Sequence, residues 1–263
     1  MLEGFVIYLI LGAFVGVIAG LLGVGGGLIM VPVLIMLFQH YDFSSEIITH
    51  LAVGTSLATI MLTSISSVRA HHIHGAVLWP VFNKLTPGII LGTLAGSWLA
   101  SLISSDALKI FFGIFELTVA LQMALELRPN ASRRLPAWPG MNLAGGLIGA
   151  VSAMVGIGGG TMTVPFLVWC NIRIQQAVAT SSACGLPIAI AGSVGFMITG
   201  WQNPQLPAGS TGFIFWPAFL GIILTSIVTA PLGARLAHRL PAGTLKKVFA
   251  IFLAILGIRM LLG

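Results

Sequence analysis

Charged residues are scarce in this chain, and more than half of it contains no acid at all. Only 7% of its 263 residues are Asp, Glu, Lys or Arg, whereas 57% are hydrophobic, and the mean hydropathy is +1.05. A soluble globule of this size needs more polar surface than such a composition can supply. The composition therefore excludes a soluble domain and predicts a multi-pass integral membrane protein.

Acidic residues end early, since the last of the six is Glu126. The segment after it carries nine Lys and Arg, and the whole chain has a net charge of +6. These cations lie near the ends of the expected helices, where they act as topology signals, and they form no basic stripe on a surface. We therefore exclude nucleic acid as a partner and expect the lipid bilayer in its place.

Cysteine is rare as well. Cys170 and Cys184 are the only two, and the 13 residues between them match no metal or redox spacing. We interpret both as packing residues within apolar runs.

His71, His72 and His74 are spaced like metal ligands, but they lie in a basic connection with no acid nearby. The sequence therefore predicts neither a metal site nor a cofactor.

Two of the apolar runs are too short to span a bilayer. Residues 26–38 and 160–170 would reach only roughly 15–20 Å as helices, against a hydrocarbon core of about 30 Å. Each follows a glycine-rich segment, and we predict that each is a half-helix that begins inside the protein. The expected elements are 4–22, 26–38, 46–70, 80–104, 106–127, 138–157, 160–170, 176–199, 213–236 and 244–262.

The two glycine-rich segments are copies of one pattern. Residues 23–27 and 156–160 read Gly-Val-Gly-Gly-Gly and Gly-Ile-Gly-Gly-Gly, begin 133 residues apart and lead into Val-Pro. Trp79-Pro80 recurs in the same order as Trp216-Pro217. Duplicated motifs in a fixed order indicate two homologous halves of one transmembrane domain. The predicted parts are repeat 1 at 1–127, a cytoplasmic linker at 128–137 and repeat 2 at 138–263.

Charge placement predicts that the two halves are inverted. The connection at 69–79 carries Arg69, whereas its counterpart at 200–212 carries no charge. Because Lys and Arg favour cytoplasmic loops, the two connections are expected on opposite sides of the membrane. About five helical elements per half, an odd number, would produce this inversion. We therefore expect an all-α integral membrane fold of two inverted repeats, with the broken helices at glycine-rich loops near the midplane.

The successive glycines are suited to an anion. Three in a row lie on no single helix face and weaken a helix by roughly 1 kcal/mol each, so we favour close approach of a ligand over helix packing. Glycine permits positive φ, and the start of a half-helix presents the positive end of its dipole. Glycines spaced by four, such as Gly12 with Gly16 and Gly145 with Gly149, are instead typical of helix packing.

Two hydroxyl pairs recur in the long runs that follow the half-helices. Hydroxyls can donate to an oxyanion without burying a charge. The alternative is that they bond to a carbonyl one turn earlier in their own helix, and the sequence leaves both interpretations open. The expected substrate-binding residues are Gly25, Gly26, Gly27, Thr55, Ser56, Gly158, Gly159, Gly160, Thr180 and Ser181.

Glu116 is expected near mid-depth, ten residues into the helix at 106–127. An intramembrane carboxylate is a functional candidate, and here it suggests a proton site coupled to anion movement; a protonated packing residue is the alternative. Its counterpart in the second half is Leu253. Arg259 lies near a helix end, where we expect its side chain to reach toward the membrane surface.

These motifs resemble the sulfite exporter TauE/SafE family of membrane permeases. The resemblance rests on both glycine-rich elements, on residues 52–56, on residues 74–79 and on the pattern at 233–249, and it covers nearly the whole chain. It implies a secondary transporter or export channel for small sulfur-containing anions, such as sulfite or organosulfonates like sulfoacetate, in the bacterial cytoplasmic (inner) membrane. A small anion is thus the expected substrate, and a homodimer is left open.

Two other classes of protein fit less well. A membrane-embedded enzyme needs a nucleophile with a base, or paired carboxylates, inside the bilayer, and the apolar runs offer no such set. A structural membrane subunit would have no use for paired half-helices. We therefore expect a transporter rather than an enzyme, and export rather than uptake.

Overall fold

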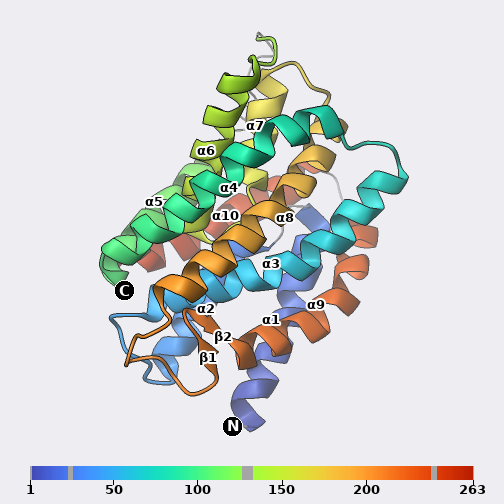
Figure 1. Cartoon of the computed structure of the whole chain (residues 1–263). Coiled ribbons are helices and arrows are strands. Elements are labelled where there is room, and N and C mark those ends of the chain that lie inside the picture. The colour runs from blue at the N-terminus through green and yellow to red at the C-terminus, as the bar shows by residue number, and fades with distance from the viewer. Residues whose placement is uncertain (1, 23–25, 126–132, 238–241, 263) are drawn as a thin grey trace.

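The computed structural model describes residues 2–22, 26–125, 133–237 and 242–262. Within these residues the chain forms ten α-helices and a single two-stranded hairpin, which confirms the all-α membrane fold (Figure 1). The elements are α1 (Leu2–Leu22), α2 (Gly27–His40), α3 (Ile48–Ile73), α4 (Trp79–Leu102), α5 (Ser105–Ala124), α6 (Trp138–Val155), α7 (Gly160–Trp169), α8 (Ile174–Thr199), β1 (Ser210–Thr211), β2 (Ile214–Phe215), α9 (Trp216–Ala237) and α10 (Ala242–Leu262).

Helix lengths and surface match a bilayer. By length and composition, α3, α4, α5 and α8 could each cross a membrane. Large apolar side chains also cover the outside of the bundle, and Leu91 and Val228, for example, are each 70% exposed. Apolar exposure on this scale is a liability in water but is the surface expected of a protein that faces lipid.

The two predicted half-helices are present. α2 contains 14 residues and α7 contains 10. At about 1.5 Å per residue they measure roughly 21 Å and 15 Å, well short of a hydrocarbon core of about 30 Å. Each helix begins directly after a glycine turn and has a proline, Pro32 or Pro165, as its sixth residue.

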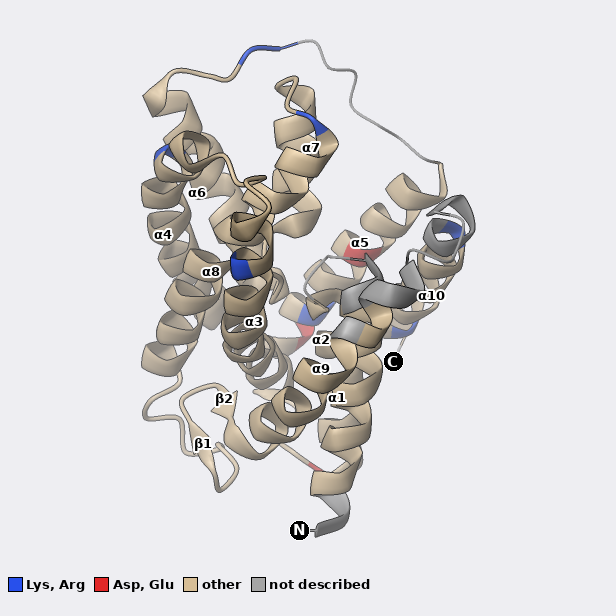
Figure 2. Cartoon of the chain, turned by 90° about the vertical axis from the view of Figure 1, so that its right-hand side faces the viewer, with Lys and Arg blue, Asp and Glu red and all other residues tan. Residues whose placement is uncertain are grey.

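Helices pair between the segments before and after the linker. α1 lies along α9, α4 along α6, and α5 along α10, as Figure 2 shows, while α3 packs against α8. Helices α1 to α5 correspond in order to α6 to α10. If each helix is replaced by its counterpart, α1·α9 becomes α6·α4, and the other two pairs become themselves. The pairing therefore interleaves the two segments rather than leaving them as separate bundles.

Glycines make the closest of these helix contacts. A Cβ on Gly12 of α1 would overlap the carbonyl oxygen of Ile222 in α9, and a Cβ on Gly145 of α6 would overlap that of Leu85 in α4. The two contacts occupy corresponding places in the two helix pairs. The packing interpretation of the glycines spaced by four is therefore confirmed.

Gly92→Ala should destabilise the α4·α6 pair. A Cβ at Gly92 would overlap the backbone carbonyl of Gly146, which cannot move without separating the helices, and overpacking of this kind typically costs about 1–3 kcal/mol. Gly146→Ala is the matched control, because its Cβ would meet Gly88 O at an ordinary 3.7 Å. Thermal unfolding in detergent should show a lower midpoint for Gly92→Ala only, and equal midpoints would contradict the close contact.

A hairpin after α8 was not expected from the sequence. β1 and β2 pair antiparallel, and the helix expected from residue 213 begins only at Trp216. Phe213 and Phe215 are buried, and the ring of Phe215 meets that of Phe38 edge-on with centroids 5.7 Å apart. The apolar residues 213–215 thus fill the bundle end as a hairpin instead of opening the next helix.

Candidate functional site

Two glycines take the same left-handed conformation at the start of the two half-helices. Gly26 has φ 74° and Gly159 has φ 73°, and each is the residue before its helix. The Gly26 carbonyl accepts from the N–H groups of Ile29 and Met30 at 3.1 and 3.0 Å. The Gly159 carbonyl accepts in the same way from Met162 and Thr163, at 3.2 and 2.8 Å. Only glycine adopts this conformation without strain.

The two glycine turns lie against each other in the interior. A Cβ on Gly27 would stand 2.6 Å from the carbonyl oxygen of Gly156 and 3.1 Å from Cα of Ile157. The Ser56 hydroxyl donates to the same Gly156 carbonyl at 2.8 Å, which ties α3 to the second turn. The starts of the two half-helices are therefore in contact inside the protein. Gly25, a predicted site residue, lies outside the described residues.

The second turn presents free backbone donors. Within the described part of the chain, none of the N–H groups of residues 158–161 donates a hydrogen bond. The first four N–H groups of a helix have no partner inside the helix, and successive N–H groups in a turn form a concavity that suits an anion. Gly159 is itself buried, so these donors are not simply exposed to bulk solvent.

Two hydroxyls that the sequence analysis missed stand beside these donors. A Cβ on Gly159 would lie 3.4 Å from Thr163 Oγ1 and 3.5 Å from Ser152 Oγ. Both residues are fully buried, and neither hydroxyl has a hydrogen-bond partner among the described residues. An unmade hydrogen bond on a buried polar group is costly, so a ligand or water is the expected partner.

The first turn lacks these hydroxyls. At the same offset of 133 residues, Ser152 corresponds to Ala19 and Thr163 corresponds to Met30. A Cβ on Gly26 would accordingly meet Val15 Cγ1 at 2.8 Å and Ala19 Cβ at 3.4 Å. The backbone geometry of the two turns is alike, but the second is polar and the first apolar. Comparing the two halves position by position could have shown this difference.

The two predicted threonines form hydrogen bonds between the two halves of the chain. Thr55 Oγ1 accepts from the N–H of Phe215 at 3.0 Å, and Thr180 Oγ1 accepts from the N–H of Leu78 at 3.0 Å. Each N–H belongs to the residue just before a Trp-Pro, so each threonine anchors the entry to α9 or α4. These contacts give Thr55 and Thr180 a structural role, and substrate contact by their hydroxyls stays a prediction.

The predicted serines differ from each other. Ser56 is engaged with Gly156, as described above, whereas the Ser181 hydroxyl is buried without a partner among the described residues. Both Thr-Ser pairs lie about two turns inside their helices, α3 and α8. Gly158 and Gly160 complete the predicted set. Gly158 lies against α8, since a Cβ on Gly185 would stand 2.9 Å from the Gly158 carbonyl oxygen.

Glu116 lies in α5 and is fully buried. Neither of its carboxylate oxygens has a hydrogen-bond partner in the described part of the chain. It shares the inward stripe of α5 with Leu108 and Phe112. Because an isolated carboxylate is costly to bury, a group placed here either carries a proton or meets a cation.

The remaining candidates have ordinary surroundings. Cys170 and Cys184 are free thiols and both are buried, as expected of packing residues. His72 Nδ1 accepts from Trp79 Nε1 at 3.3 Å, and His74 Nδ1 bonds the carbonyl of Ala70 at 2.7 Å. These histidines are engaged with the α3 end and the start of α4.

Known proteins resemble the chain over nearly its whole length. Residues 8–260 match the family described as sulfite exporter TauE/SafE. A protein of Haemophilus influenzae named a probable membrane transporter protein is 40% identical over 256 residues, which cover 97% of each chain. Another of that name in Methanocaldococcus jannaschii is 28% identical over 97% of this chain and 94% of its own. No solved structure matches the chain.

The duplicated turns, the apolar helices and these matches point to the same conclusion. The relatives carry the name of membrane transporters, and the paired half-helices are the architecture in which transporters place their binding sites. The chain belongs to the sulfite exporter TauE/SafE family and is a membrane transporter.

Proposed function

We propose that the protein exports a small sulfur-containing anion, sulfite or an organosulfonate such as sulfoacetate, across the bacterial cytoplasmic membrane. The observation that carries the proposal is the row of four N–H groups at residues 158–161, at the positive end of α7, which donate no hydrogen bond to any residue that the structure describes. Such donors recognise negative charge and planar or tetrahedral oxyanions. The buried hydroxyls of Ser152 and Thr163 add donors at the same turn.

The chemistry of the second turn favours the weak binding and fast release that a transporter needs. No Lys or Arg is among the residues that form the two turns, so the anion is held by backbone dipoles and hydroxyls alone. Binding without a fixed countercharge is weak, and release is correspondingly fast. Because the cytoplasm is electrically negative, efflux of an anion is favoured by about 2.3 kcal/mol per charge per 100 mV and needs no other driving force.

An inverted arrangement of the halves would let the pathway open to either side. Two observations support it: Ser44, four residues after α2, donates to Gln205, six residues after α8, at 2.9 Å, and α7 ends at Trp169, five residues before α8 begins. The two half-helices thus end beside the two opposite ends of α8, a helix of 26 residues.

Cysteine labelling in intact cells tests this topology. We expect an impermeant maleimide to label Gln205→Cys directly, and to label His74→Cys and Lys247→Cys only after permeabilisation. Residues 69–79 carry Arg69 and residues 235–247 carry four Lys and Arg, and basic connections favour the cytoplasm. Cys170 and Cys184 are buried, so background labelling should be low. Labelling of residues 205 and 247 from the same side would contradict the inverted arrangement.

Transport assays in proteoliposomes test the function itself. Sulfite, sulfoacetate, thiosulfate and taurine would each be loaded, and flux measured under an imposed voltage and an imposed pH gradient. We expect flux of a sulfur oxyanion that follows the voltage, whereas zwitterionic taurine should move least. If no sulfur-containing anion moves faster than through empty liposomes, the proposed substrate class is wrong.

Replacing the two hydroxyls tests where the anion sits. Ser152→Ala combined with Thr163→Val removes both donors beside Gly159 and should weaken sulfite affinity by about tenfold or more, since hydrogen bonds to charged groups contribute about 1.5–3 kcal/mol each. Ser182→Ala is the control, because its hydroxyl bonds Val178 O within its own helix. Equal affinity in the parent and the double variant would place the anion away from the second turn.

A further inference from the structure

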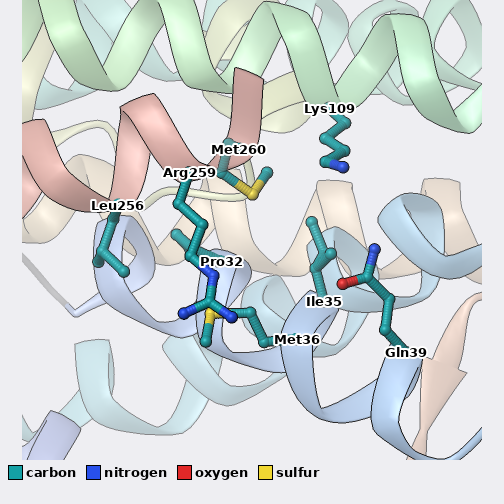
Figure 3. Close-up of a pocket in the computed structure, with 8 residues that line it drawn as sticks. All are labelled: Pro32, Ile35, Met36, Gln39, Lys109, Leu256, Arg259 and Met260. Carbon is teal, nitrogen blue, oxygen red and sulfur yellow. The ribbon is translucent and has the colours of Figure 1, made fainter. Parts of the chain in front are cut away.

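A pocket along α2, beginning about one and a half turns after its glycine turn, contains two cations. Its volume is about 110 Å³, and it lies between α2, α5 and α10 (Figure 3). Lys109 comes from α5, Arg259 from α10 and Gln39 from α2, so three helices contribute one polar side chain each. The lining residues are Pro32, Ile35, Met36, Gln39, Lys109, Leu256, Arg259 and Met260.

The charges of this pocket are of one sign. None of the eight lining residues is Asp or Glu, so no lining carboxylate neutralises Lys109 or Arg259. Figure 3 shows the Lys109 ammonium and the Gln39 amide pointing toward each other, and the Arg259 side chain extending from α10 toward α2. Two cations that line one pocket without a carboxylate favour an anion in it. The sequence alone suggested only that Arg259 reaches toward the membrane surface.

The shape of the pocket restricts the ligand. Apolar walls from Pro32, Ile35, Met36, Leu256 and Met260 surround the polar groups, while Gln39 and Arg259 are exposed and Lys109 is half-buried, so an anion can reach both cations from outside. A water molecule takes up about 30 Å³ of the liquid, so 110 Å³ has room for a small oxyanion with some of its hydration shell. Guanidinium and ammonium groups are the usual partners of such oxyanions.

We propose that this pocket is a second oxyanion site, held by Lys109 and Arg259 with the amide of Gln39. The pocket runs along α2 from Pro32 to Gln39, whereas the glycine turn lies at the other end of the same half-helix. It would hold the transported anion at the end of its route near the α2 C-terminus. The identity of the occupant rests on the proposed function, but the chemistry of the site does not.

Binding of sulfite to the purified protein in phosphatidylcholine nanodiscs tests the pocket. We expect Lys109→Gln with Arg259→Gln to weaken one component of the binding isotherm by about tenfold or more. Lys84→Gln with Arg173→Gln removes the same charge from exposed sites outside the pocket and should leave both components unchanged. Gly159→Ala should retain the pocket component. A pocket variant that binds like the parent would overturn the proposal.

Two further measurements separate the outcomes. Transport of sulfite by a protein whose pocket variant binds unchanged would reject the pocket and keep the proposed function. Binding that depends on the pocket, without any transport of sulfite, would keep the pocket and reject the proposed function. A second set of nanodiscs with phosphatidylglycerol identifies the source of the oxyanion: if the lipid displaces sulfite from the parent, and native mass spectrometry finds less bound lipid on the pocket variant, the occupant is a lipid phosphate. If neither sulfite nor the anionic lipid distinguishes the variant from the parent, no oxyanion site exists there.

Discussion

Gly159→Ala should abolish sulfite transport while the protein still folds in the membrane. Forcing alanine to φ 73° costs about 1–2 kcal/mol, and relief of that strain would turn the N–H groups of residues 158–161 away from the anion. Loss of even one such charge-assisted hydrogen bond adds about 1.5–3 kcal/mol. Together these terms lower affinity by about one hundredfold or more.

Folding should survive because the new methyl group meets a movable atom. The nearest neighbour of a Cβ on Gly159 is the terminal Cδ1 of Ile188, which can rotate away. Gly26→Ala imposes the same backbone strain at the apolar turn and should reduce transport less. The readouts are sulfite affinity, flux and the thermal midpoint of each purified variant.

Gly75→Ala is the matched control for backbone strain. Gly75 has φ 62°, and a Cβ there would meet nothing within 4 Å. It lies in the connection between α3 and α4, away from both turns, so this variant should lose stability but not transport. If Gly159→Ala and Gly75→Ala transport equally well, the second glycine turn is architectural and the anion binds elsewhere.

Glu116→Gln should leave voltage-driven anion efflux intact and abolish any response to a pH gradient. The amide has nearly the same shape as the carboxyl group but cannot exchange a proton at neutral pH, and the buried position has no second titratable partner on the inward stripe of α5. A coupling proton would therefore have no place to bind. Flux in proteoliposomes under separate voltage and pH gradients measures both responses.

Asp106→Asn provides the control on the same helix. Asp106 is exposed in the first turn of α5, so its replacement removes one acid without touching the interior. We expect parent-like flux under both gradients. Unchanged pH dependence in Glu116→Gln would mean that the carboxyl group only packs, which is the alternative interpretation of its position.

The short helices could be predicted because their causes are local. Three consecutive glycines and the Val-Pro that follows them stop one helix and start another, and Gly26 and Gly159 have the positive φ that this requires. The partners of each helix could not be predicted in this way. Gly12 and Gly16 indicated a close neighbour, but that neighbour is α9, more than two hundred residues later in the sequence.

The site was predicted less completely than the fold. The sequence indicated the glycine turns, yet Thr55 accepts a backbone N–H from Phe215, a residue that adjoins it only through the tertiary fold. Ser152 and Thr163 flank Gly159 from two different helices and belong to no motif. Lys109 and Arg259 are far apart in the sequence and line one pocket because α5 and α10 pack together.

The pairing of α1 with α9 fixes the order of assembly during synthesis. At about 5–20 residues per second, a ribosome needs roughly 10–40 s after completing α1 before it begins α9. During that interval the glycine face of α1 lacks the helix on which it packs in the finished protein. Because Gly26 follows α1 closely and rests on Val15, the first turn gains its final support only when the chain is nearly finished. An incomplete chain in the membrane therefore lacks the helix that supports α1 behind the first turn.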